Sequence, residues 1–213
     1  RTFQVVFMIK LLVPVFATLT LIAAPATARP IEKTKYKYYT ISGNSASAIY
    51  TAMIKRGPDV NGVNAYASTT ANSSQDGKLV AQGKSCRVDG YNFSIDFTIN
   101  LPKLKNEGAL TGQTAAKWGQ FKSFLKTHEE QHRSIWLGCA RSLESQVKSL
   151  RAPDCKAFDR QAAKPWKSMR NSCDKQHAAF DAAEQRRLLK HPFVKLVLDK
   201  RLSSTKGFKI KQP

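Results

Sequence analysis

Three absences narrow the class of protein before any motif is considered. No segment recurs with a period of about 20–50 residues, which excludes solenoids and propellers. Long hydrophobic runs are missing beyond residue 28, and the mean hydropathy of −0.39 excludes a polytopic membrane protein. No CxxC pair occurs, so a zinc ribbon or redox motif is not expected. The 213 residues, 42% of them apolar, indicate a globular chain of one domain, or at most two small ones.

Acidic side chains are also scarce. The chain has 15 Asp and Glu against 35 Lys and Arg, which gives a net charge of +20 at pH 7. Such a surface attracts anionic polymers and lipid headgroups, so a weak association with an anionic envelope surface is one expected interaction. The sequence has no helix-turn-helix, RNP or zinc-finger pattern, so specific nucleic-acid binding is not expected.

The first 28 residues have the features of a secretory signal peptide. Lys10 precedes an uncharged apolar run over residues 11–24, and Ala26-Thr27-Ala28 is a small-x-small cleavage pattern. We expect cleavage after Ala28, no transmembrane segment in the mature chain, and a periplasmic or secreted location. An uncleaved N-terminal anchor is the alternative. Met8 is the expected start, with residues 1–7 as a gene-model overhang.

Export changes the interpretation of the four cysteines. An even number in an oxidising compartment indicates two disulfides, and the alternative is four buried thiols. From the positions along the chain we favour a bridge from Cys155 to Cys139 or to Cys173. The candidates for the two disulfides are Cys86, Cys139, Cys155 and Cys173.

The hydrophobic pattern predicts strands first and helices later. Strands are expected over residues 36–42, 63–70, 78–89 and 93–99, with a helix capped by Ser45 over residues 46–55 and a hairpin turn at Asp76-Gly77. From about residue 114 apolar residues recur every three or four positions, which predicts one long helix to about residue 152. A second helical region over residues 154–200 should kink or break at Pro165 and Pro192. This order predicts an α+β, zincin-like fold in which a small antiparallel sheet packs against the helices, over residues 29–202 with a basic tail at 203–213.

The chemistry is concentrated in residues 128–132, whose sequence is His-Glu-Glu-Gln-His. On a helix, residues four apart lie about 5–6 Å from each other, so His128 and His132 can bind one zinc ion. The motif has a chance expectation of roughly 0.002 at this composition. Zinc lowers the pKa of a bound water, Glu129 removes its proton as it attacks a peptide carbonyl, and the proton passes to the leaving amine. Two core histidines without a metal are the alternative interpretation.

A tetrahedral catalytic zinc site needs a third protein ligand. The metzincin extension is absent, because Ile135 and Gly138 stand where Gly and His would be required. His177 is therefore the first choice, and Asp181, four residues later, would orient a ligand from the second shell. The remaining choices follow in the order Glu184, Asp181 and Glu144. His191 precedes Pro192 at a helix end and is expected to be structural or exposed.

Several segments resemble a bacterial family of unknown function that is described as putative secreted or periplasmic zinc-dependent proteases. The resemblance rests on YYTISG at 38–43, RGP at 56–58, Cys86, LPKL at 101–104, the Trp118-x-x-Phe121-x-x-x-Leu125-x-x-His128-Glu129-x-x-His132 segment, and Phe180-Asp181. It implies a zinc-dependent peptidase with His128 and His132 as ligands and Glu129 as the catalytic residue.

Two functions are therefore weighed. The first is an exported zinc metallopeptidase that acts on a peptide or protein substrate. The second is a non-catalytic binding or structural protein of the envelope that retains the helix and uses its basic surface. If the first holds, His128 and His132 should converge with a third donor from residues 140–191 and open to a cleft beside the strand at 93–99.

Overall fold

The computed structural model describes residues 29–206, and their side chains up to residue 199. The signal peptide predicted for residues 1–28 lies outside the described residues. The described chain contains five strands, one 3-10 helix and four α-helices. In chain order these are β1 (Ile31–Ile41), α1 (Ala46–Arg56), β2 (Asp59–Val60), β3 (Val63–Asn64), β4 (Ser68–Gln82), β5 (Ser85–Leu104), the 3-10 helix (Glu107–Ala109), α2 (Gly112–Ser149), α3 (Cys155–Lys190) and α4 (Pro192–Lys206).

The α+β class is confirmed, but the main sheet is mixed rather than antiparallel. Its strand order is β1-β5-β4. β4 and β5 form an antiparallel hairpin, whereas β1 runs parallel to β5, with Ile31 beside Ser94 and Ile41 beside Leu104. The parallel pairing is possible because α1, β2, β3 and β4 lie between β1 and β5 in the chain, and a segment of this length permits a crossover connection.

The hairpin turn predicted at Asp76-Gly77 is wrong. Both residues lie inside β4, where the register shifts between Asp76 and Lys78, and the chain reverses between Gln82 and Ser85. At Gly77 a Cβ atom would lie 2.7 Å from Val88 Cγ2, so the glycine serves a close approach rather than a turn. The strand predicted over 63–70 is likewise divided between β3 and the start of β4.

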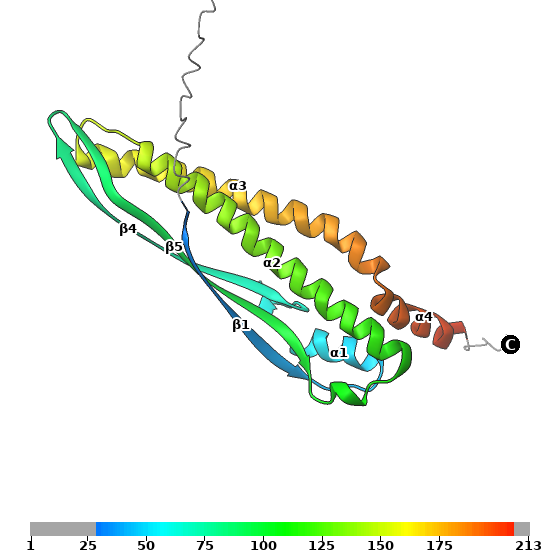
Figure 1. The fold of residues 1–213 in the computed structure, drawn as a ribbon. Helices are drawn as coiled ribbons and strands as arrows, with labels where there is room; N and C mark the ends of the chain where they lie inside the picture. The colour runs from blue at the N-terminus through cyan, green and yellow to red at the C-terminus, as the bar shows by residue number, and fades with distance from the viewer. Residues whose placement is uncertain (1–28, 207–213) are drawn as a thin grey trace, which may run out of the picture.

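The central strand shows the alternation that its sequence predicts. Phe93, Ile95, Phe97 and Ile99 are buried and face the long helix α2, which covers one side of the sheet (Figure 1). α2 contributes Trp118, Phe121 and Leu125 to one core cluster, and Cys139, Leu143 and Val147 to another. The predicted helix therefore exists, and the HExxH segment lies in the part of it between these two clusters.

The second helical region breaks at Pro192 but not at Pro165. α3 continues through Pro165, and α4 begins at Pro192. A proline inside a helix removes one backbone hydrogen bond, and the burial of Phe158 and Met169 on either side of Pro165 holds the helix on the core. α4 extends to Lys206, so residues 203–206 of the predicted tail are helical, and the remainder lies outside the described residues.

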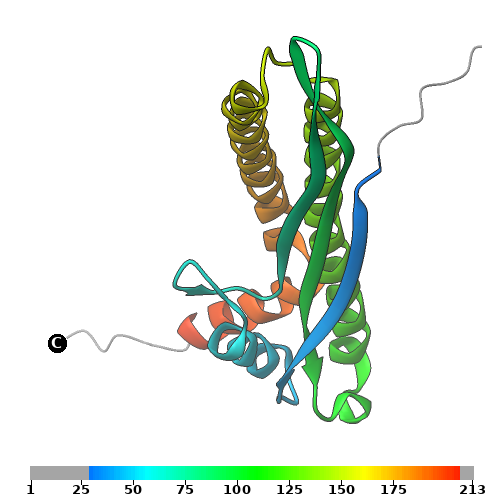
Figure 2. The same ribbon diagram turned by 90° about the vertical axis from the view of Figure 1, so that its left-hand side faces the viewer.

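Two disulfides are present, but the favoured pairings are wrong. Cys86 is bonded to Cys155, and Cys139 is bonded to Cys173. The first joins β5 to the start of α3, because the backbones of Cys86 and Ala152 pair in an isolated bridge. The second joins α2 to α3, which run side by side along much of their length (Figures 1 and 2). Within residues 29–206, no helix is long and apolar enough to cross a membrane.

Candidate metal centre

Helix α2 places both motif histidines on the side that faces α3. One turn separates them, so their rings lie 4.7 Å apart, with 3.1 Å between His128 Nε2 and His132 Nε2. Both side chains are mostly buried, and Phe180 of α3 packs against each ring.

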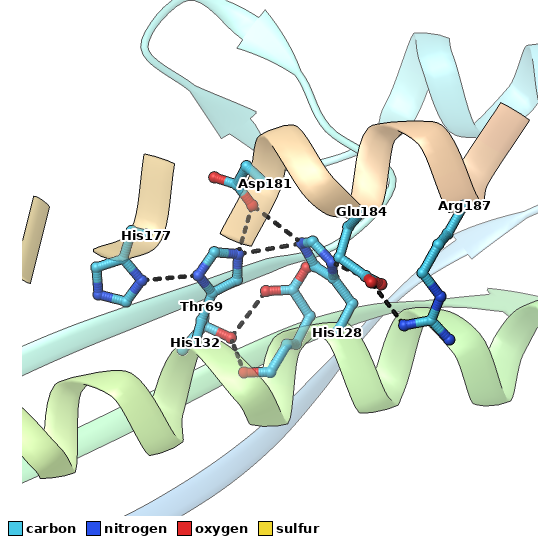
Figure 3. Close-up of polar contacts among 8 residues, drawn as sticks. Thr69, His128, His132, His177, Asp181, Glu184 and Arg187 are labelled. Carbon is cyan, nitrogen blue, oxygen red and sulfur yellow. Dashed lines mark hydrogen bonds and ion pairs between the residues drawn. The ribbon is translucent and has the colours of Figure 1, made fainter. Parts of the chain in front are cut away.

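Helix α3 brings a carboxylate to the same point. Asp181 Oδ1 lies 2.9 Å from His132 Nε2 and 3.4 Å from His128 Nε2. Figure 3 shows Asp181 reaching from α3 toward the two histidines. These three residues form the group of potential metal ligands found within the described part of the chain.

The spacing of the three donor atoms fits a tetrahedral ion. Ligand atoms held about 2.0–2.1 Å from a tetrahedral zinc lie ~3.3 Å from one another. The observed separations are 2.9, 3.1 and 3.4 Å. The group therefore resembles one face of a coordination tetrahedron, with the fourth position left for another ligand.

No placement of protons on the two rings lets all three pairs of atoms in this group form hydrogen bonds. Each ring nitrogen is either a donor or an acceptor, and an ionised carboxylate only accepts. If both Nε2 atoms carry protons, two donors face each other at 3.1 Å. If one of the Nε2 atoms is unprotonated, it is an acceptor, and it faces the Asp181 oxygen, which is also an acceptor. A cation bound by all three lone pairs removes the conflict.

The other nitrogen of each ring faces a second partner. His132 Nδ1 lies 2.8 Å from His177 Nδ1, and His128 Nδ1 lies 3.8 Å from Glu184 Oε2. Figure 3 shows His132 between His177 and His128, with Glu184 beside His128. Glu184 is buried, and Arg187 donates to its Oε1 at 2.6 Å. Partners at these positions fix the orientation of a metal-binding imidazole.

Glu129 projects into the same cleft and is held by the sheet. Its side chain is only 4% exposed, and Thr69 Oγ1 of β4 lies 2.8 Å from its Oε2 and 3.0 Å from its backbone oxygen. Burial raises the pKa of Glu129 to about 7, although the hydrogen bond from Thr69 opposes this rise. A carboxylate with a pKa near neutrality can both accept and return a proton.

Burial also lowers the pKa values of the three histidines at this site, His128, His132 and His177. The neutral imidazole is the form that binds metals, so burial favours the protonation state that a metal centre requires.

The centre lies in a cleft of about 510 Å³. One wall is formed by six consecutive residues from Asn64 to Thr69, and the rest of the lining comes from Val60 of β2 and from α2 and α3. The cleft is therefore beside the edge strand β4, and not beside the strand at 93–99 as expected, because β5 is the central strand of the sheet.

Two further residues considered from the sequence, Glu144 and His191, are not part of the group of potential ligands. Glu144 is buried about three turns beyond His132, where Lys148 pairs with it, so it is not brought to the cleft. His191 packs on Phe121 and Phe124, in agreement with a structural role. Thr69 was not anticipated, since a single threonine in a strand gives no sequence signal for its partner.

Comparison with known protein families places most of the chain in one of them. Residues 36–188 match a family described as "Bacterial protein of unknown function (DUF922)". No curated protein and no solved structure matches the chain. Because the match covers more than half of the sequence and includes all of the residues that form the centre, the chain belongs to this bacterial family of unknown function.

Proposed function

We propose that the chain is an exported zinc-dependent peptidase. His128, His132 and Asp181 are the ligands, and Glu129 is the general base and acid. The observation that carries the proposal is the convergence of two imidazole nitrogens and one carboxylate oxygen at 2.9–3.4 Å from one another. His177, the first choice from the sequence, is assigned instead as the residue that orients His132, because its Nδ1 lies 2.8 Å from His132 Nδ1, on the side of the ring away from Asp181.

A zinc ion in this position would supply an activated water and a positive charge for the carbonyl oxygen of the substrate. Glu129 takes a proton as the water oxygen bonds to the carbonyl carbon. It then returns the proton to the amine nitrogen as the C–N bond breaks. Thr69 holds the Glu129 carboxylate in place throughout by its hydrogen bond to Oε2.

The surrounding side chains keep the ligands in their metal-binding form. With its Nε2 directed at the ion, His132 carries its proton on Nδ1 and donates it to His177 Nδ1. Glu184 faces the corresponding nitrogen of His128, and Arg187 balances the buried Glu184 charge. Two disulfides support the proposed export, since such bonds persist in oxidising compartments.

The test compares two neighbouring glutamates on α2. Glu129→Gln should reduce peptide hydrolysis by at least ~100-fold while zinc remains bound, because it removes the proton acceptor but no ligand. Glu130→Gln is the matched control. Glu130 is more exposed and accepts a hydrogen bond from Tyr36, so its replacement should leave the activity unchanged.

Mass spectrometry of a peptide mixture measures cleavage, and atomic emission measures the zinc content. Equal activity in the wild type and the Glu129→Gln variant would overturn the assignment of the base. Stoichiometric zinc without cleavage of any peptide in the mixture would favour the non-catalytic envelope protein instead.

A further inference from the structure

The helices α2 and α3 run in opposite directions past the proposed metal ligands, and different side chains line the two ends of the cleft between them. At one end Trp136 and His177 pack together, with 5.3 Å between ring centroids. At the other, most of the lining is apolar, and its polar members, Asn64 and Gln185, carry no charge. Phe124 lies one turn before His128, and Leu188 lies one turn after Glu184. This apolar end is lined by Val60, Ala65, Tyr66, Phe124, Leu125 and Leu188.

The charges along the cleft are all acidic. Glu129, Asp181 and Glu184 line it, whereas no Lys or Arg does so among the described residues. This is unusual in a chain with more than twice as many basic as acidic side chains. The Arg187 guanidinium lies over the Phe124 ring at this end, but it is already paired with Glu184 at 2.6 Å. An acidic side chain of a substrate would therefore lose its hydration at the apolar end without gaining a cation of its own, and burial of an unpaired charge is costly.

A small hairpin holds one wall of the apolar end in place. β2 and β3 pair through Asp59–Asn64 and Val60–Val63, and Asn61 and Gly62 both have positive φ, as a two-residue hairpin turn requires. The base of the hairpin is fixed, since Ala65 N donates to the Pro58 oxygen at 2.9 Å. A Cβ at Gly57 would lie 1.9 Å from the Ala65 oxygen, so the two backbones are in close contact.

Val60 is the residue of this hairpin that presents apolar surface to the cleft. Val60 is 43% exposed although it is apolar, and it lines the cleft together with residues of α2 and α3. Val63, its cross-strand neighbour, is 69% exposed and does not line the cleft. The two valines thus form a matched pair on one hairpin, and of the two only Val60 lines the cleft.

We propose that this apolar end is a specificity subsite that binds a large apolar side chain of the substrate, next to the scissile bond. Val60 and Leu188 select that side chain, and acidic side chains are rejected. The inference rests on the proposed function, because it assigns the substrate class of the same cleft. The expected substrates are polypeptides with residues such as Leu, Phe or Met beside the bond that is cleaved.

The subsite is tested by binding, with the zinc-loaded Glu129→Gln protein, so that cleavage does not remove the ligand. Fluorescent peptides are compared in pairs, and the two members of a pair differ only in having Leu or Asp at one position. Successive pairs of the series carry this substitution at successive positions along the peptide. At one position the Leu peptide should bind at least ~10-fold more tightly, the discrimination expected of an apolar pocket.

Val60→Asp in the same protein should remove this preference, and Val63→Asp should retain it. Equal binding of Leu and Asp peptides at every position, or equal effects of the two valine variants, would overturn the subsite. A different result would show that the proposed peptidase function is wrong while the subsite exists. If Glu129→Gln prefers the Leu peptide but the wild type does not cleave it, the subsite stands and the peptidase assignment fails.

Discussion

The two ring nitrogens of each site histidine have different partners, and this division assigns a role to each neighbouring side chain. The Nε2 atoms of His128 and His132 meet at Asp181, whereas their Nδ1 atoms face Glu184 and His177. Sequence alone identified all five residues but not this division. His177, Asp181 and Glu184 share one helix face, and only the position of α3 along α2 decides which of them reaches the Nε2 side.

Asp181 and His177 are therefore expected to differ in their effect on zinc affinity. Asp181→Asn, which removes a charged ligand, should weaken binding by more than ~100-fold. His177→Ala should lower the zinc affinity by about 10–100-fold, because it removes the hydrogen-bond partner that orients His132. Asp159→Asn, at an exposed position of the same helix, is the control. Titration with a zinc-competing chelator measures all three, and a larger loss in His177→Ala would reverse the assignment.

His191 is expected to give the fold a pH dependence that is separate from the proposed metal centre. Burial lowers the pKa of His191, and its Nδ1 accepts a hydrogen bond from Phe193 N at 3.2 Å. The unfolded chain therefore binds a proton more readily than the folded one. As the pH falls below about 6.5, the ordinary pKa of histidine, the free energy of unfolding should decrease.

His191→Asn keeps an acceptor for Phe193 N but removes the titrating ring. Urea unfolding of zinc-free protein at about pH 8 and pH 5 should show a smaller loss of stability on acidification in the variant than in the wild type. The same loss in both proteins would show that His191 contributes nothing to the pH dependence.

At the scale of elements, the centre depends on how α3 is held against α2. The Cys139–Cys173 disulfide joins the two helices about two turns from His132 and from Asp181. Cys86–Cys155 anchors only the start of α3, far from the ligands along the helix. The sequence predicted α2 well, because its apolar residues follow the helical period, but it could not give the pairing of cysteines on separate elements.

Removal of each disulfide should therefore have a different effect on the metal centre. Cys139→Ala with Cys173→Ala should weaken zinc binding by about 10-fold or more, because α3 can shift and carry Asp181 away. Cys86→Ala with Cys155→Ala should lower the free energy of unfolding, typically by about 2–5 kcal/mol, with little effect on zinc affinity in the folded protein. Chelator competition and urea unfolding measure the two quantities. Equal zinc affinities in the two double variants would contradict this role of the helix–helix disulfide.

The sheet illustrates the limit of prediction at this scale. The alternation at Phe93, Ile95, Phe97 and Ile99 correctly predicted a half-buried strand. The Asp76-Gly77 pair was misleading, since a turn signal of two residues cannot be distinguished from an irregularity within a long strand. Another dipeptide of the same type, Asn61-Gly62, does form a hairpin turn, which positions Val60. This turn was not predicted from the sequence.

The whole molecule combines a basic surface with an acidic cleft. The sequence carries a net charge of +20, and the cleft nevertheless lacks lysine and arginine among its described lining residues. Composition predicted the overall charge and the periodicities predicted the α+β class. Neither could predict the separation of charge, because it follows from which faces of α2, α3 and β4 meet.

The surface charge predicts a salt-sensitive association with anionic membranes. Binding to vesicles that contain anionic lipid should be measurable at low ionic strength and should be largely lost at about 0.3 M salt, where charges are screened over a few ångströms. Co-sedimentation with neutral vesicles is the control. Binding that is equal for neutral and anionic vesicles would show that another interaction is responsible.

The central claim is that His128, His132 and Asp181 bind one zinc ion, and its most direct test is a zinc titration of metal-free protein. The wild type should bind one equivalent, and His132→Ala, which removes one of the three ligands, should lose stoichiometric binding. Absence of stoichiometric zinc in the wild type, or an unchanged affinity in His132→Ala, would contradict the metal centre.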